Sequence, residues 1–120
     1  MLPSHKTRIL IATQPVDFRT GHDGLAALVQ SALKEDPFTG AVFVFRAKRV
    51  DRLKILFWDG SGLWVCAKRL EKGRFGWPEG GGGQSKVVLS HEELALLLGG
   101  IDLAGSKRRA WYRRVSHGVN

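Results

Sequence analysis

Apolar and polar residues alternate along three consecutive segments in the middle of the chain, which predicts three β-strands. The segments run from Ala41 to Arg46, Leu53 to Asp59 and Leu63 to Arg69, and the spacer at 59–62 has the length of a hairpin turn. Short links between neighbouring strands favour an antiparallel meander. Both faces of these strands carry apolar side chains, so each face requires a cover or a partner.

A further strand and a helix are predicted before this meander. The β-branched and leucine-rich run from Arg8 to Thr13 is typical of a strand. From Leu25 to Leu33 apolar residues recur at helical spacing, behind a capping-box pattern that begins at Thr20. Pro37 disfavours helical backbone at the residue before it, so we expect the helix to end by then.

After the meander the pattern predicts one more strand and a second helix. Lys86 to Leu89 reads as a short strand, and a second capping box begins at Ser90. Leu94, Leu97 and Leu98 form an apolar stripe, and a glycine pair ends the helix. The expected fold is α+β: a small antiparallel sheet of about five strands with two short helices packed on it.

The length and composition favour one domain. At 120 residues with 43% apolar residues, the chain has enough material for one compact core. We expect an N-terminal extension at 1–7, a single domain at 8–102 and a basic, mobile tail at 103–120. The tail carries five cations and no acid: Lys107, Arg108, Arg109, Arg113 and Arg114.

The net charge of +8 is concentrated in the meander and the tail. Residues 46–74 hold nine Lys and Arg residues against three acids. These cations are Arg46, Lys48, Arg49, Arg52, Lys54, Lys68, Arg69, Lys72 and Arg74. A polyphosphate backbone is the commonest partner of so dense a cationic surface, so we predict nucleic-acid binding.

Aromatic residues are interleaved with these cations, and exposed ones could stack on unpaired bases. They are Trp58, Trp64, Phe75 and Trp77. The alternative is that the aromatics belong to the core and the charges only solvate an edge strand.

Other patterns bear on compartment and membrane association. Cys66 is the single cysteine, so an internal disulfide is impossible, and its apolar surroundings predict a small buried core residue in a reducing compartment. No apolar run approaches the roughly 20 residues of a membrane span, and the first residues lack the apolar segment of a signal peptide. We expect a cytoplasmic protein with no membrane partner.

Candidate catalytic and metal-binding residues are few. Asp17 and Arg19 lie between the first strand and helix, where we expect them to pair or to orient the backbone, and Gly24 allows a close backbone approach. A metal at Asp17 would need a second acid, and the neighbouring acids Asp23, Asp36 and Asp59 have no spacing typical of a metal site. The four histidines are scattered. We predict no enzyme activity, no metal and no cofactor, with a small nuclease at Asp17 as the weakest alternative.

Several longer motifs resemble one known family, the small second-reading-frame protein TnpB of the bacterial insertion-sequence family sixty-six. The motifs are Asp17-Phe18-Arg19 with 21–25, Asp36-Pro37-Phe38-Thr39-Gly40, Val42-Phe43-Val44-Phe45-Arg46, the run 53–60, the run 68–75 and the run 94–102. The resemblance covers about residues 8–102 in order and spacing. Phe18 stands where this family usually has Met.

The resemblance implies an accessory protein of transposition that acts beside a larger transposase, which carries the catalytic acids. From the residues we add that the basic sheet patch binds element DNA, at transposon ends and with low sequence specificity, or binds the transposase–DNA complex. The corresponding location is the nucleoid. The alternative is an adaptor that docks on the transposase through an apolar sheet face or the second helix, without direct DNA binding. The sequence pattern indicates neither a preference for single-stranded or double-stranded DNA nor an oligomeric state.

Overall fold

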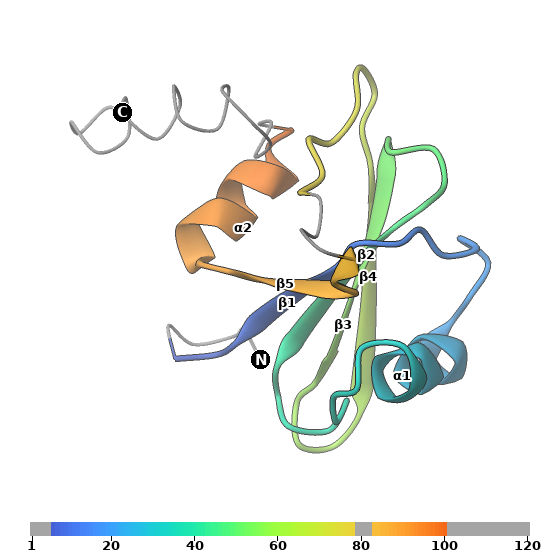
Figure 1. Ribbon diagram of the computed structural model, residues 1–120, viewed down its shortest axis with the longest axis vertical. Helices are drawn as coiled ribbons and strands as arrows, with labels where there is room; N and C mark the ends of the chain where they lie inside the picture. The colour runs from blue at the N-terminus through green and yellow to red at the C-terminus, as the bar shows by residue number, and fades with distance from the viewer. Residues whose placement is uncertain (1–5, 79–82, 101–120) are drawn as a thin grey trace.

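The computed structural model describes residues 6–78 and 83–100, which form a five-stranded sheet and two helices (Figure 1). The elements are β1 (Ile9–Ala12), α1 (His22–Ser31), β2 (Val42–Arg46), β3 (Arg52–Trp58), β4 (Leu63–Arg69), β5 (Lys86–Leu89) and α2 (His91–Leu98). The α+β class is confirmed, and each strand agrees with its predicted bounds to within one residue. Most of the expected N-terminal extension and the whole basic tail lie outside the described residues.

The strand order in the sheet is β4-β3-β2-β1-β5. The antiparallel meander of β2, β3 and β4 is confirmed, with Val44 opposite Ile55 and Ile55 opposite Cys66. The sheet is mixed rather than wholly antiparallel, because β1 pairs parallel with β2. Helix α1 connects these two strands, and a crossover of this kind returns the chain in the same direction.

Strand alternation divides the apolar residues into two clusters, one on each face of the sheet. One cluster joins Leu10, Phe43, Phe45 and Leu56 to Leu25 and Val29 of α1. The other joins Ile9, Ile11, Val42, Val44 and Leu53 to Phe75 and to Leu97 of α2. The central strands β1 and β2 are therefore buried on both faces, which explains their continuous apolar sequences.

The start of α1 differs from the predicted capping box at Thr20. The N-cap residue is Gly21, and no side chain accepts a hydrogen bond there. Thr20 lies one residue too early, and its carbonyl oxygen instead accepts a hydrogen bond from Lys54 Nζ at 2.9 Å. A Cβ added at Gly24 would lie 2.5 Å from Thr20 Cγ2, so Gly24 permits the close packing of this turn.

The end of α1 comes six residues before Pro37. The last helical residue is Ser31, and Lys34 adopts a left-handed backbone conformation with φ of 56°. The Glu35 amide then donates to the Val29 carbonyl at 3.0 Å, which satisfies a carbonyl at the helix end.

Helix α2 begins with the predicted capping box. The Ser90 side chain accepts a hydrogen bond from the Glu93 amide, and the Glu93 carboxylate accepts one from the Ser90 amide. Leu97 is fully buried, and Leu94 and Leu98 pack against the same cluster. Within the described part of the chain, neither helix is long and apolar enough to cross a membrane.

Cys66 is exposed, so the prediction of a buried core thiol is wrong. It lies on β4 at the edge of the sheet, and alternation places it on the face opposite to the partly buried Leu63 and Val65. The buried cluster on the Cys66 face includes no β4 residue, so this part of the edge strand is uncovered.

Candidate nucleic-acid interface

The loop between β1 and α1 is tied to the carboxyl end of β2. The Val16 amide donates to the Arg46 carbonyl at 2.9 Å, and Val16 forms an isolated parallel bridge with Ala47. The Ala47 amide donates to the Arg52 carbonyl at 3.0 Å, which closes the turn between β2 and β3. The carboxyl ends of neighbouring parallel strands are where open α/β sheets commonly bind ligands.

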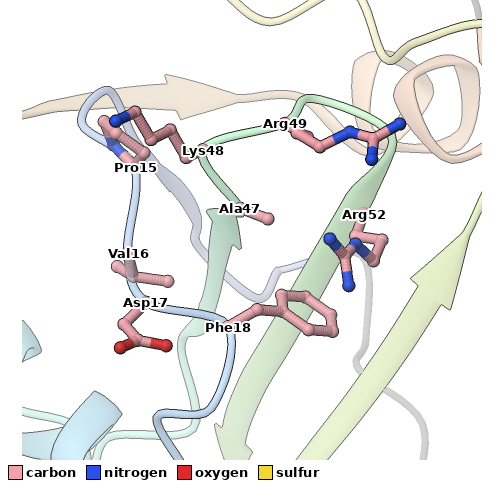
Figure 2. Close-up of a pocket in the computed structure, with 8 residues that line it drawn as sticks. All are labelled: Pro15, Val16, Asp17, Phe18, Ala47, Lys48, Arg49 and Arg52. Carbon is pink, nitrogen blue, oxygen red and sulfur yellow. The ribbon is translucent and has the colours of Figure 1, made fainter.

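A hollow of about 520 Å³ lies at this junction (Figure 2). It is lined by Pro15, Val16, Asp17, Phe18, Ala47, Lys48, Arg49 and Arg52. Half of these side chains are apolar and three are cationic, so the hollow combines an apolar wall with positive charge.

Phe18 is held in this hollow by two cations of β3. The Arg52 guanidinium carbon lies 5.2 Å from the centroid of the Phe18 ring, and Lys54 Nζ lies 4.6 Å from the same centroid. Lys54 Nζ also donates to the carbonyl oxygens of Phe18 and Thr20 at 2.6 and 2.9 Å. Lys54 therefore fixes the loop, and its charge is already engaged by the protein.

Asp17 and Arg19 form an ion pair on the same loop. Arg19 Nη2 donates to Asp17 Oδ2 at 2.8 Å, while Arg19 Nε and the Arg19 amide donate to Oδ1 at 3.2 and 2.9 Å. These hydrogen bonds lower the pKa of Asp17 to about 2. Figure 2 shows the carboxylate pointing away from the cations of the hollow. Asp17 is thus a fully ionised, locally neutralised residue at neutral pH.

A second loop brings more cations to this end of the sheet. The Leu70 amide donates to the Asp51 carbonyl at 2.8 Å, and the Phe75 amide donates to the Val50 carbonyl at 2.6 Å. The loop after β4 therefore lies against the turn between β2 and β3, as Figure 1 shows. This places the exposed side chains of Lys72 and Arg74 at the same end of the molecule as the hollow.

We call this group of residues the cationic end. It comprises Lys48, Arg49, Arg52, Arg69, Lys72 and Arg74. Only two carboxylates belong to the same segments: Asp51, at 3.9 Å from Arg49 and 3.6 Å from Arg52, and Glu71, at 3.6 Å from Arg69. Within the described part of the chain, Lys48, Lys72 and Arg74 make no ion pair.

The remaining predicted cations have other surroundings. Arg46 is half buried, and its Nη1 donates to the Ala47 carbonyl at 3.4 Å. Lys68 points to the opposite face from Arg69, and its Nζ donates to the Leu98 carbonyl at the end of α2, at 2.6 Å. The five tail cations lie outside the described residues. The structure thus brings six of the fourteen predicted cations together and assigns Lys54 and Lys68 to internal contacts.

Most of the candidate stacking aromatics have structural contacts. Phe75 is buried, and Trp77 Nε1 donates to the Ala12 carbonyl at 2.7 Å. Trp58 packs edge-on against Phe38. Trp64 is 47% exposed and stacks on Phe57, with its Nε1 bound to Asp59. For Phe75 and Trp77 the core alternative is the correct one.

Sequence reasoning missed the apolar wall of the hollow, because Pro15, Val16 and Phe18 read as an ordinary loop. Phe18 was the one available signal, since an aromatic ring beside Asp17 and Arg19 stands where the resembled family usually has Met. Across residues 6–78 and 83–100, no group of three or more His, Cys, Asp or Glu residues is arranged to hold a metal ion.

Comparison with known proteins identifies the family. The family model described as "IS66 Orf2 like protein" matches residues 7–108. The chain is 51% identical over 107 residues to "Uncharacterized protein y4jC" of Sinorhizobium fredii strain NGR234, covering 89% of this chain and 90% of the relative. It is 44% identical over 103 residues to "Uncharacterized protein y4hO" of the same strain, covering 85% and 88%. No solved structure matches the chain. The chain therefore belongs to the IS66 Orf2-like family and is an accessory protein of an insertion sequence.

Proposed function

We propose that this accessory protein is non-catalytic and binds element DNA, alone or within the transposase–DNA complex, through the cationic end. The observation that carries the proposal is the pair of hydrogen bonds that hold the 70–75 loop against the turn at 47–51. The pairing of β3 with β4 already places Arg52 opposite Arg69, and these hydrogen bonds bring the cations of the two flanking loops to the same place. The six cations thus lie over one end of the sheet with three carboxylates, Asp51, Glu71 and Asp17, the last of which is bound by Arg19.

The arrangement of Arg52 and Arg69 supports an anionic partner. Their Cα atoms are direct partners across β3 and β4, and like charges directly opposite on neighbouring strands are destabilising. Their carboxylate contacts, at 3.6 Å to Asp51 and 3.6 Å to Glu71, are long. The Arg69–Glu71 pair is exposed, and exposed ion pairs contribute little, so a phosphate can replace or supplement this pair at small cost.

Salt dependence is the direct test. If the cationic end engages roughly four to six phosphates, the logarithm of duplex affinity falls with the logarithm of salt concentration at a slope of about −4 to −5. Fluorescence anisotropy with a labelled duplex measures this slope. A flat salt dependence contradicts the proposal.

Matched charge variants locate the interface. The double variant K48Q/K72Q removes two lysines of the cationic end, and K6Q/K34Q removes two exposed lysines elsewhere. We expect K48Q/K72Q to weaken binding to all sequences alike and to reduce the slope by about 2, because phosphate contacts carry no base information. K6Q/K34Q should leave the slope unchanged. Equal effects of the two double variants would assign the binding to net charge alone.

The second candidate function is docking on the larger transposase without direct DNA binding. The exposed Trp64, stacked on Phe57 beside the exposed Cys66, forms an uncovered apolar strip on β4. The leucines of α2 are less suited to docking, because they already pack into the core. If the protein docks on the transposase in this way, Trp64→Arg should abolish its capture of purified transposase in nuclease-treated buffer. K48Q/K72Q should leave that capture unchanged.

A nuclease at Asp17 is the least supported function. Its carboxylate is bound by Arg19 through three hydrogen bonds. We expect no Mg²⁺-dependent cleavage of element ends, and we expect Asp17→Asn to support transposition at the wild-type frequency. In the cell, the proposed DNA binding places the protein at the nucleoid.

A further inference from the structure

The hollow is larger and more apolar than a phosphate site requires. Its volume of about 520 Å³ falls within the range of roughly 300–1,000 Å³ typical of small-molecule sites. Phosphate contacts on an exposed surface would need only the cations Lys48, Arg49 and Arg52. The apolar wall of Pro15, Val16, Phe18 and Ala47 therefore points to a ligand that also has an apolar, flat part.

The hollow has two chemically different sides. Figure 2 shows Lys48 beside Pro15 on one side of Ala47, and Arg52 beside the ring of Phe18 on the other. The Arg52 guanidinium lies over the Phe18 ring, with its carbon 5.2 Å from the ring centroid, and Lys54 Nζ lies 4.6 Å from the same centroid. A base can therefore stack on the outer side of the guanidinium–ring pair but not between the two groups. Both kinds of surface stack on nucleobases. Lys48 and Arg49 are exposed and point to opposite sides of Ala47 (Figure 2), so each is available to a different phosphate of a strand.

Arg52 retains unused capacity to donate hydrogen bonds. Its Nε is shielded from solvent and has no hydrogen-bond partner, with Asp51 Oδ1 at 3.6 Å as its contact. A ligand cannot reach the shielded Nε, but within the described residues the terminal nitrogens Nη1 and Nη2 make no hydrogen bond, so they can donate to an acceptor on a ligand in the hollow. The edges of the bases carry such acceptors, as ring nitrogens or carbonyl oxygens.

We propose that the hollow takes one unpaired nucleotide of a single DNA strand, with the base against Arg52 and Phe18 and its two flanking phosphates on Lys48 and on Arg49, which point to opposite sides of Ala47. This inference rests on the proposed nucleic-acid binding and makes it more specific. A base inside a duplex is paired and stacked, so it cannot enter the hollow unless it is first extruded. The protein should therefore prefer single strands, hairpin loops or junctions to uninterrupted duplex.

The test compares three ligands of equal length at one salt concentration: oligothymidylate, the same backbone with abasic positions, and a duplex. We expect wild-type protein to bind oligothymidylate about tenfold more tightly than the abasic strand. The reason is that stacking of one base on an aromatic or guanidinium surface raises affinity by about tenfold. Phe18→Leu keeps apolar volume and removes the ring, so it should reduce oligothymidylate affinity to the abasic level. Its affinities for the abasic strand and the duplex should stay within about twofold.

Two further variants complete the test: one is a control outside the hollow, and the other changes a second residue of the proposed base site. Phe38→Leu removes another exposed ring, which packs on Trp58 rather than in the hollow, and should leave the preference intact. Arg52→Lys keeps the charge and removes the planar group, so it should abolish the preference for bases while the salt slope is unchanged. This second variant tests the proposal even if Phe18→Leu fails to fold.

Failure of this proposal is distinguishable from failure of the proposed function. Equal wild-type affinity for oligothymidylate and the abasic strand, together with weaker binding by K48Q/K72Q, overturns the nucleotide site and leaves phosphate binding standing. No effect of K48Q/K72Q on any of the three ligands overturns both. A preference for bases that survives both Phe18→Leu and Arg52→Lys places base recognition elsewhere and overturns the assignment to this hollow.

Discussion

Residues of the same type have different roles here, and lysine shows it most clearly. Lys54 binds two carbonyl oxygens of the β1–α1 loop, Lys68 binds the last carbonyl of α2, and Lys72 is exposed without an ion pair. A cation near the end of a helix also interacts favourably with the helix dipole. Charge counting treats these three residues as equal, whereas their contacts make the first two part of the fold.

Lys54→Met should lower the stability of the fold. The substitution keeps the aliphatic chain and leaves the Phe18 and Thr20 carbonyls without their charged donor, so we expect a loss of about 1–3 kcal/mol in the free energy of unfolding. Urea denaturation measures it. Lys72→Met, on an exposed loop, should change stability by less than about 0.5 kcal/mol. Equal effects would contradict an internal role for Lys54.

The Asp17–Arg19 pair predicts a pH-dependent contribution to stability. The hydrogen bonds from Arg19 lower the pKa of Asp17 from 3.8 to about 2. The folded state thus favours the ionised carboxylate, and this stabilisation is fully present above pH about 4 and lost as pH falls through about 2. The melting temperatures of wild type and Asp17→Asn should differ above pH 4 and converge near pH 2. A difference that persists unchanged at pH 2 would show that ionisation of Asp17 is irrelevant.

At the scale of elements, two similar capping patterns have different outcomes. Ser90 caps α2 with a complete capping box, whereas Thr20 lies outside α1, which begins after Gly21. The difference is tertiary, because the Thr20 carbonyl is bound by Lys54 and its methyl group packs on Gly24. The sequence motif thus indicates a helix start nearby but does not identify the capping residue.

Substitution of the two residues tests this distinction. Ser90→Ala removes the acceptor for the Glu93 amide, so we expect a loss of about 0.5–2 kcal/mol in stability. Thr20→Ala removes no cap and should cost clearly less. Chemical denaturation of both variants gives the comparison. A larger effect at Thr20 than at Ser90 would contradict the assignment of the caps.

At the scale of the whole molecule, stability depends on a sheet that is covered on both faces. Phe43 and Phe45 face α1, and Val42 and Val44 face α2, so one strand contributes to both clusters. The same central position lets β2 carry the cationic turn at its carboxyl end. The proposed interface therefore lies next to the most buried part of the fold.

A cavity variant tests how far the fold depends on β2. Phe43 is fully buried, and Phe43→Ala should cost about 3–5 kcal/mol and thereby unfold much of the protein at moderate temperature. Val88 is 62% exposed on the edge strand β5, so Val88→Ala should change stability by about 0.5 kcal/mol or less. Thermal and urea unfolding measure both variants. Similar losses would show that the two strands are equally central.

The sequence by itself determined the five strands, the second helix with its cap at Ser90, and the concentration of cations around the meander. These features follow from local periodicity and composition, which contacts between neighbouring residues are enough to set. Only the tertiary structure decided that β1 and β2 are parallel, that Cys66 is exposed, and which cations share one end of the molecule. The reason is sequence distance: Lys54 reaches Phe18 across 36 positions and Lys68 reaches Leu98 across 30, and no local pattern encodes such pairs.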